Sequence, residues 1–241
     1  EAAVGRDPDG TVHMIIAADP GSQTAATQVA SLVGGRFISG RLSVESSDER
    51  QDLVLARVTA NAVKRFPAME GLGSHGNNVT MPGTVQVAAG RDKGFSPLTI
   101  LASADDSWNE KETTDFVNSV ATFDASKEKK GARSVAIQMT REMGDRTQKI
   151  LLLGDSDCFS NGELMRQRLG VNSANFPFAY QTFKWLCDDR YPIDTPRAHS
   201  TDGSLRVGFK AMPYVKWAFL GVLPLLMLLA SVLIIIRRKS R

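Results

Sequence analysis

Cysteine and histidine are scarce in this chain, and their scarcity excludes several kinds of site. The cysteines are Cys158 and Cys187, and the histidines are His13, His75 and His199. Two distant cysteines supply neither a tetrahedral zinc site nor a disulfide framework. An exported domain could still pair them, although lone cysteines are more often small buried hydrophobic residues. We therefore expect no metal site built on these residues.

Nucleotide-binding patterns and basic stripes are also missing. No G-x-G-x-x-G follows a strand-like run, and G-x-x-x-x-G-K-[ST] does not occur, so we expect no nucleotide or other cofactor site. The net charge is +3, but four positive charges lie in the final RRKSR, which leaves −1 for the rest. A body without a basic face is not expected to bind nucleic acid. Internal repeats and a cleavable signal peptide are not visible either.

The most extreme feature that is present is an apolar run near the C-terminus. Residues 217–236 read WAFLGVLPLLMLLASVLIII, 20 residues without a charge. That length matches the hydrocarbon core of a bilayer, and one internal proline does not outweigh it. With Tyr214 and Trp217 at the expected interface, we predict a transmembrane helix over residues 214–236.

The charges beside this run predict its orientation. The RRKSR tail, residues 237–241, favours a C-terminus in the cytoplasm and a body on the other side of the inner membrane, although Arg206, Lys210 and Lys216 weaken the asymmetry. We therefore expect an extracytoplasmic domain over residues 1–196, a linker over 197–213, the span, and the basic cytoplasmic tail. A start at Glu1 leads us to expect a processed chain or part of a longer one.

Short apolar segments predict the strands of the domain. They are bounded by turn residues and rich in β-branched side chains. The predicted strands are residues 11–19, 79–88, 98–102, 134–140 and 149–153, the last two joined through Gly144 and Asp145. Residues 47–66 allow two interpretations, a helix capped by Ser47 or Asp48, or a strand over 53–58 followed by a short helix capped by Thr59.

Two further helices are expected after the last strand. Ser160 or Asn161 caps the first, which continues over residues 163–169. The second begins near Asn175, and its helical spacing places Phe176, Ala179, Phe183 and Leu186 on the buried side. Strands that alternate with helices and end in a continuous apolar strand predict an α/β fold, with a mostly parallel sheet flanked by helices.

The stretch KILLLGDSDCFSN, residues 149–161, carries the strongest hint of chemistry. Asp155 and Asp157 follow a buried strand, where Mg²⁺ could be held, but no lysine, phosphate loop or third acid is evident nearby. The other interpretation is structural: Gly154 makes the turn and the aspartates accept backbone N–H bonds. Cys158 is not on a nucleophile elbow and has no histidine base nearby in sequence. We favour the structural interpretation and expect no catalytic residue.

The order of these segments resembles a known family. KILLLGDSDCFSN, then FAYQTFKWLCDD, a linker, one span and an arginine-rich tail resemble the GldG-type auxiliary components of ABC transporters, named for gliding motility. VTMPGTVQV and ILASADDSW are similar to that family as well. The departures are Cys158, where an aromatic residue is common, and Tyr180 and Lys184, where asparagines are common.

The resemblance implies a periplasmic α/β domain of the amidotransferase-like or flavodoxin-like kind without catalytic residues, tethered beside a permease and a separate ATPase. It implies that Gly154, Asp155, Asp157, Ser160 and Asn161 form a family turn, which is a candidate binding edge, and that Trp185 and Leu186 belong to a helix motif. In the span, Ala218 and Gly221 are three residues apart, so we expect them to let a partner helix approach closely. The alternative function is a tethered ligand-binding domain, with carbohydrate as the candidate ligand.

Overall fold

The structure is a computed structural model, and it describes residues 2–6, 11–45, 50–65, 69, 72, 77–91, 93–168, 170–190 and 212–239. The chain forms two compact units, Glu1–Ile193 and Asp194–Arg241, which are treated separately below. Most of the predicted linker, the candidate caps Ser47 and Asp48, and His75 and His199 lie outside the described residues.

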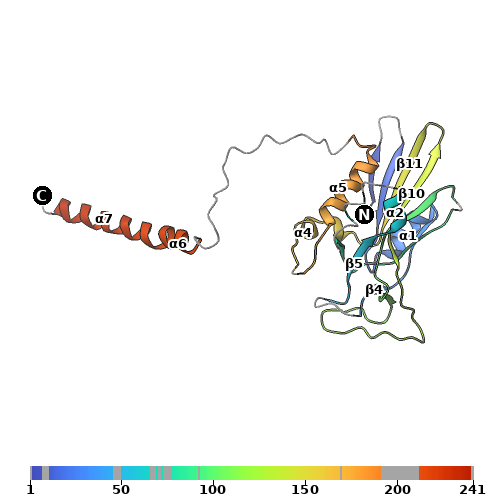
Figure 1. Cartoon of the computed structure of the whole chain (residues 1–241), viewed down its shortest axis with the longest axis horizontal. Coiled ribbons are helices and arrows are strands. Elements are labelled where there is room, and N and C mark those ends of the chain that lie inside the picture. The colour runs from blue at the N-terminus through green and yellow to red at the C-terminus, as the bar shows by residue number, and fades with distance from the viewer. Residues whose placement is uncertain are drawn as a thin grey trace. The chain divides into compact units, whose positions relative to one another are not determined.

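The first unit is rich in short strands (Figure 1). Its strands are β1 Ala2–Arg6, β2 Val12–Ala17, β3 Gly35–Phe37, β4 Arg41–Ser43, β5 Leu53–Val58, β6 Val79–Pro82, β7 Val87–Ala89, β8 Ser96–Ala102, β9 Trp108–Glu110, β10 Ser134–Met143 and β11 Arg146–Leu153. Its helices are α1 Gln23–Ser31, α2 Ala60–Arg65, the 3₁₀ turn η2 Asp157–Phe159, α4 Asn161–Leu164 and α5 Asn175–Leu186.

The predicted mostly parallel sheet is wrong. Seven strands pair in the order β1-β2-β11-β10-β8-β5-β6, and two small ladders, β3-β7 and β4-β9, stand apart. Only β2 and β11 run parallel among the neighbouring pairs of this sheet; the others are antiparallel. The result is a mixed, mostly antiparallel sheet that curls into a half-barrel and carries few helices.

The error has a physical origin in β11. Its apolar residues alternate between two cores, with Leu151 and Leu153 in one cluster and Ile150 and Leu152 in the other. A helix covers each side, because Phe178 of α5 belongs to the first cluster and Ala30 of α1 to the second. The continuous apolar run correctly indicates a strand buried on both faces, but burial does not fix the direction of neighbouring strands.

Most predicted strands are confirmed, and one is divided. Residues 11–19 contain β2, and residues 98–102, 134–140 and 149–153 lie within the longer strands β8, β10 and β11; β10 and β11 form a hairpin around Gly144, whose φ is +69°. Residues 79–88 do not form one strand: β6 pairs with β5, whereas β7 pairs with β3. Gly83, at a φ of +73°, interrupts this apolar stretch between the two ladders.

The helix predictions are partly confirmed. The strand–helix interpretation of residues 53–65 is correct, and the Thr59 hydroxyl accepts the Ala62 N–H (3.2 Å) at the start of α2. The predicted helix over 163–169 is wrong in extent, because α4 ends at Leu164. α5 begins at Asn175 as predicted, but its buried side is Asn175, Phe178, Ala179, Thr182 and Leu186.

Phe176 and Phe183 were therefore wrongly predicted to be buried in the core. They are 62% and 44% exposed, whereas Phe178 is fully buried. The helix is rotated about its axis relative to the prediction because Asn175 and Thr182, both polar, point inward. Cys158 and Cys187 are free thiols in the structure.

The described part of the second unit is one continuous helical segment, made of α6 Met212–Trp217, a π-helical turn η4 Ala218–Val222, and α7 Leu223–Lys239. Residues 213–239 form a helix long and apolar enough to cross a membrane, and its most apolar 18-residue stretch has a mean hydropathy of 2.9. In the π turn the Leu223 N–H donates to the Ala218 carbonyl, five residues back. Pro224 follows at once, and a wider turn relieves the clash between its ring and the preceding turn.

Candidate functional site

The parallel strands β2 and β11 bring two acidic segments to one edge of the sheet. Asp19 follows β2 and Asp155 follows β11, whose residues 150–153 pair with residues 14–17 of β2. Both oxygens of Asp19 bind Ser156: Oδ1 accepts its N–H (2.8 Å), and Oδ2 its hydroxyl. The turn after β11, residues 154–161, is called the acidic turn below.

Asp155 lies at the buried centre of the acidic turn. Its side chain is fully buried; Oδ1 accepts the Asp157 N–H (2.7 Å), and Oδ2 has no hydrogen-bond partner among the described residues. Burial raises the pKa of Asp155 well above its ordinary value, and the negative charges of Asp19 and Asp157 raise it further. A neutral carboxylic acid suits this position, whereas a cation ligand must be ionised.

The remaining acids of the turn do not complete a metal site. Asp157 is exposed, and its pKa is raised by partial desolvation and by Asp19 and Glu163. Within the described ranges, no three His, Cys, Asp or Glu side chains are grouped so that they could hold a metal ion. The geometry favours the structural interpretation of the two aspartates.

Gly154 is constrained by a neighbouring backbone. It joins two ladders, because its N–H donates to Val135 O (2.8 Å) and its carbonyl accepts the Val85 N–H (2.7 Å). A Cβ atom on Gly154 would lie 2.1 Å from Val85 O and 3.2 Å from Val135 O. The chain needs glycine here because three backbone segments converge, rather than because of a tight left-handed turn.

Cys158 has the environment of a core residue. It is fully buried, and its thiol lies 3.3 Å from the Asp155 carbonyl oxygen. Burial raises the pKa of the thiol well above its ordinary value, and the surrounding acids add to the effect. A catalytic nucleophile needs the opposite shift, toward the thiolate.

Ser160 ends the acidic turn by capping α4. Its hydroxyl accepts the Glu163 N–H (3.2 Å), so Ser160 is the cap, and Asn161 is the exposed first residue of the helix. This cap places Glu163 so that its side chain points inward, where it is 5% exposed.

Glu163 belongs to a buried network that we call the polar bridge: Thr80, Glu163, Arg168 and Asn175. Arg168 holds both oxygens of Glu163 (2.7 and 2.8 Å), and the Thr80 hydroxyl reaches the same carboxylate (3.0 Å). Burial alone would raise the pKa of Glu163, but the Arg168 and Thr80 hydrogen bonds lower it below its ordinary value. Glu163 is therefore a buried, paired carboxylate.

Asn175 connects the polar bridge to the acidic turn. Its side-chain Oδ1 accepts the Thr80 N–H (2.9 Å), and its Nδ2 donates to Thr80 O (2.8 Å) and Cys158 O (3.0 Å). One amide thus fastens the edge strand β6, the acidic turn and the start of α5 together.

The helix-motif residues pack behind the turn. Leu186 is buried and Trp185 is half-buried against the same core cluster. Lys149 of β11 donates to the Trp185 carbonyl (2.7 Å), pairs with Asp188, and lies 5.8 Å from the Trp185 ring centroid. A basic side chain at the end of α5 stabilises the last carbonyls of the helix.

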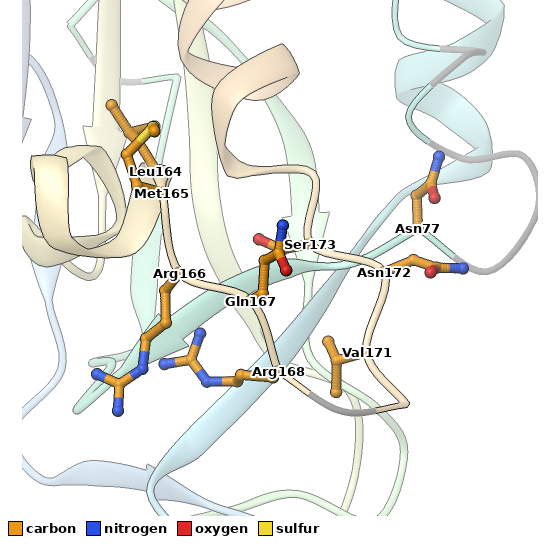
Figure 2. Close-up of a pocket in the computed structure, with 9 residues that line it drawn as sticks. All are labelled: Asn77, Leu164, Met165, Arg166, Gln167, Arg168, Val171, Asn172 and Ser173. Carbon is orange, nitrogen blue, oxygen red and sulfur yellow. The ribbon is translucent and has the colours of Figure 1, made fainter. Parts of the chain in front are cut away.

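A polar hollow lies in the loop between α4 and α5 (Figure 2). Its volume is about 620 Å³, and its lining is Asn77, Leu164, Met165, Arg166, Gln167, Arg168, Val171, Asn172 and Ser173. Arg166 and Arg168 point to one end, whereas Asn77 and Asn172 lie at the other. We call this feature the loop hollow.

The predicted contact residues of the span lie in the π turn. Ala218 and Gly221 are its first and fourth residues. A π turn rotates less per residue than an α turn, so these two positions diverge more than the sequence spacing suggests. A Cβ on Gly221 would lie 3.3 Å from the Trp217 ring, which covers part of that small surface.

Sequence reasoning missed Asp19, Thr80, Glu163, Arg168 and Asn175 as partners of the acidic turn. One signal was available, because residues 11–19 and 149–155 are both apolar strands that end in an aspartate. The hydrogen bonds from Thr80 to Asn175, 95 positions apart, have no local signature.

Comparison with known proteins gives one distant likeness. No family model matches the chain, and a search of curated proteins found no match. A solved structure described as "mmIFT52 N-terminal domain" is similar over 71% of this chain and 63% of that chain, with 11% sequence identity and a TM-score of 0.44. The chain therefore spans less than two thirds of that domain, and the likeness assigns no family.

Proposed function

We propose that the chain is a non-enzymatic, membrane-anchored accessory subunit of an ABC-type transport system, and that its globular unit assists a permease and a separate ATPase. One observation carries the proposal. A long apolar helix without a buried surface belongs to the same chain as a globular unit whose acidic turn is occupied by structural contacts.

The anchor is supported by the chemistry of the C-terminal helix. An ideal helix of 27 residues is about 40 Å long, enough for a hydrocarbon core of about 30 Å. Its large side chains are exposed throughout, as expected for a segment that faces lipid or partner helices. Arg237, Arg238 and Lys239 at its end favour a cytoplasmic C-terminus and a periplasmic globular unit at the inner membrane.

The absence of a nucleotide-binding motif from this sequence supports the assignment of ATP hydrolysis to a separate subunit. A chain without a phosphate-binding loop depends on another subunit for ATP hydrolysis, and a single span cannot form a transport path by itself. The ordered resemblance of residues 79–241 to GldG-type components supports a permease and an ATPase as the proposed partners. The contribution of this chain is then to couple or to position the permease and the ATPase.

Affinity purification of the full chain from native membranes in mild detergent tests the proposal. We expect a multi-span permease and a P-loop ATPase to co-purify in comparable amounts. Recovery of the chain without either protein would contradict the accessory role. A reporter that is active only outside the cytoplasm, fused at the Glu1 end, should be active if the topology is right.

The loop hollow favours a second candidate function, a tethered ligand-binding domain. Carboxamides and a hydroxyl from Asn77, Gln167, Asn172 and Ser173 line it, and such groups bind polyhydroxylated ligands such as oligosaccharides. Binding of glycans to the full chain in lipid nanodiscs, abolished in the Gln167→Ala/Asn172→Ala variant, would favour this candidate over the accessory role.

A further inference from the structure

The exposed side of α5 carries an aromatic ridge, defined by Phe176, Tyr180 and Phe183. Positions i, i+4 and i+7 lie on one side of a helix. Phe176 is 62% exposed, Phe183 is 44% exposed, and Tyr180 is half-buried between them. In the described part of the globular unit, Phe176 and Phe183 are the two aromatic residues among the large exposed hydrophobic side chains, and both belong to this ridge.

The ridge is held rigidly by the aromatic layer beneath it. The Phe159 ring packs against Phe183 (centroids 6.1 Å apart) and against the buried Phe178 (5.4 Å). Asn175 fixes the start of α5, and Lys149 fixes its end. An exposed apolar surface on a rigid support is a common mark of an interaction site.

The size of the ridge argues against a stable contact with a second copy of the chain. A phenylalanine side chain buries on the order of 200 Å² at most, so the two exposed fractions leave about 200 Å² in total. Stable protein interfaces bury about 800 Å² on each partner. A small aromatic ridge is instead typical of a helix that inserts side chains shallowly into a lipid interface.

The length of chain that follows α5 also favours the lipid interface as the partner of the ridge. Only 21 residues separate Arg190 from Met212, where the membrane-crossing segment begins. Those residues reach at most about 75 Å when fully extended. α5 therefore stays within that distance of the bilayer, and tethering makes a weak contact persistent.

We propose that the aromatic ridge of α5 docks onto the bilayer surface, with Phe176 and Phe183 inserted among the lipids at the level of the upper acyl chains. This inference rests on the membrane anchoring in the proposed function. It makes α5 the membrane-facing element of the globular unit, while the loop hollow has no aromatic residue in its lining and the aromatic residue of the acidic turn, Phe159, packs beneath the ridge.

Fluorescence quenching by brominated lipid tests the docking. The full chain is reconstituted into phosphatidylcholine vesicles that carry bromine near the headgroup end of the acyl chains. The background is Trp217→Phe, which removes the tryptophan of the span; the signal of the remaining Trp108 and Trp185, measured in this background alone, is subtracted. Phe176→Trp reports on the ridge, and Val117→Trp, at a position 74% exposed outside α5, is the matched control.

We expect the tryptophan at 176 to be quenched at least about twofold more than the one at 117. Phe183→Trp gives the same readout if the first variant does not fold. Equal quenching at both positions, with the chain resistant to alkaline extraction, would overturn the docking and leave the anchor intact. Extraction of the chain at alkaline pH would instead overturn the anchor, and the docking with it.

Discussion

The acidic turn and the loop that follows it are neighbours in sequence but are built in opposite ways. In the turn, Gly154, Asp155 and Cys158 are buried; the Gly154 backbone is bonded to Val135 and Val85, and the Cys158 carbonyl accepts the Asn175 side-chain amide. In the loop, Met165, Arg166 and Gln167 are exposed and line a hollow. The turn has little freedom to meet a ligand. In the loop, attachment is confined to Arg168 and to the hydrogen bonds of residues 172–174 with Asn78 and Asn175, and residues 165–167 face solvent.

This difference shows that the most conspicuous stretch of the sequence and the surface available for function are not the same part of the molecule. A run of glycine, acids and cysteine attracts attention because such residues do chemistry elsewhere. In this protein, those residues are already engaged in structural contacts with the polar bridge and with the ends of neighbouring strands. The surfaces left for partners are the loop hollow and the aromatic ridge, neither of which has a distinctive motif. The predictions below test this contrast, beginning with the largest effect.

Gly154→Ala is expected to cost at least about 4 kcal/mol of the free energy of unfolding, or to prevent folding. Its Cβ would lie 2.1 Å from Val85 O and 3.2 Å from Val135 O, and these backbone groups are held in place by their own hydrogen bonds with Gly154. Gly162→Ala, whose Cβ would lie 3.6 Å from Ser160 Oγ, is the control and should be tolerated. Denaturant unfolding of both variants measures the difference. Similar midpoints would show that the turn is not a packing constraint.

Arg168→Met is expected to cost about 3 kcal/mol, because it leaves the buried Glu163 carboxylate without its main partner. The Thr80 hydroxyl remains, which keeps the cost at the low end of such changes. Arg166→Met is the matched control, since its side chain is 62% exposed and lies 3.6 Å from the same carboxylate. If chemical denaturation gives the two variants equal stability, the polar bridge is not what holds α4.

Asp155→Asn should change how stability depends on pH. The unfolded chain releases the Asp155 proton near pH 3.9, but burial raises the pKa in the folded protein, so the folded state binds more protons above that pH. The free energy of unfolding therefore falls as pH rises from about 4 toward the raised pKa. Melting curves recorded across this pH range should therefore show a smaller loss of stability with rising pH for the variant than for the wild type. An unchanged slope would mean that Asp155 ionises freely.

Acidification should act through Glu163 in the opposite direction. Arg168 and Thr80 lower its pKa against the effect of burial, so its stabilising contribution is present above the unfolded pKa and is lost as pH falls. Glu163→Gln should reduce acid sensitivity while lowering stability at neutral pH. Comparison of the stability of wild type and Glu163→Gln between pH 3 and 7 separates the effect of the Glu163 carboxyl group from that of Asp155.

The smallest effect is expected in the loop. Gln167→Ala and Asn172→Ala change exposed side chains, and each should alter stability by less than about 0.5 kcal/mol. A larger loss in either variant would show that the loop is part of the framework, and the contrast with the acidic turn would fail.

The sequence predicted the local elements well and the topology poorly. Apolar periodicity located β2, β8, β10 and β11, and Asn175 marked the start of α5. Strand direction depends on pairs such as Val54 with Met81 and Leu101 with Ala136, which lie far apart in the chain and leave no local pattern. The buried side of α5 was misjudged because phenylalanine was assumed to face inward, while Asn175 and Thr182 do so.

The acidic turn was interpreted as structural from sequence, but for an incomplete reason. The sequence predicted only that Gly154 makes the turn, whereas glycine is needed there because Val85, a residue 69 positions earlier, approaches closely. The burial of Asp155 beside Asp19 follows from the single parallel pair in the sheet. Such contacts are determined by the fold and cannot be read from the turn itself.

The most direct test of the central claim compares two double variants in co-purification from native membranes. Asp155→Asn/Asp157→Asn alters the acidic turn, and Ala218→Leu/Gly221→Leu blocks close approach to the span while keeping it apolar. The account predicts that the turn variant recovers the permease as well as wild type does, whereas the span variant inserts into the membrane but recovers less. A turn variant that folds and inserts, yet loses the permease, a bound ligand or a hydrolytic activity, would contradict the account and make the acidic turn a functional site.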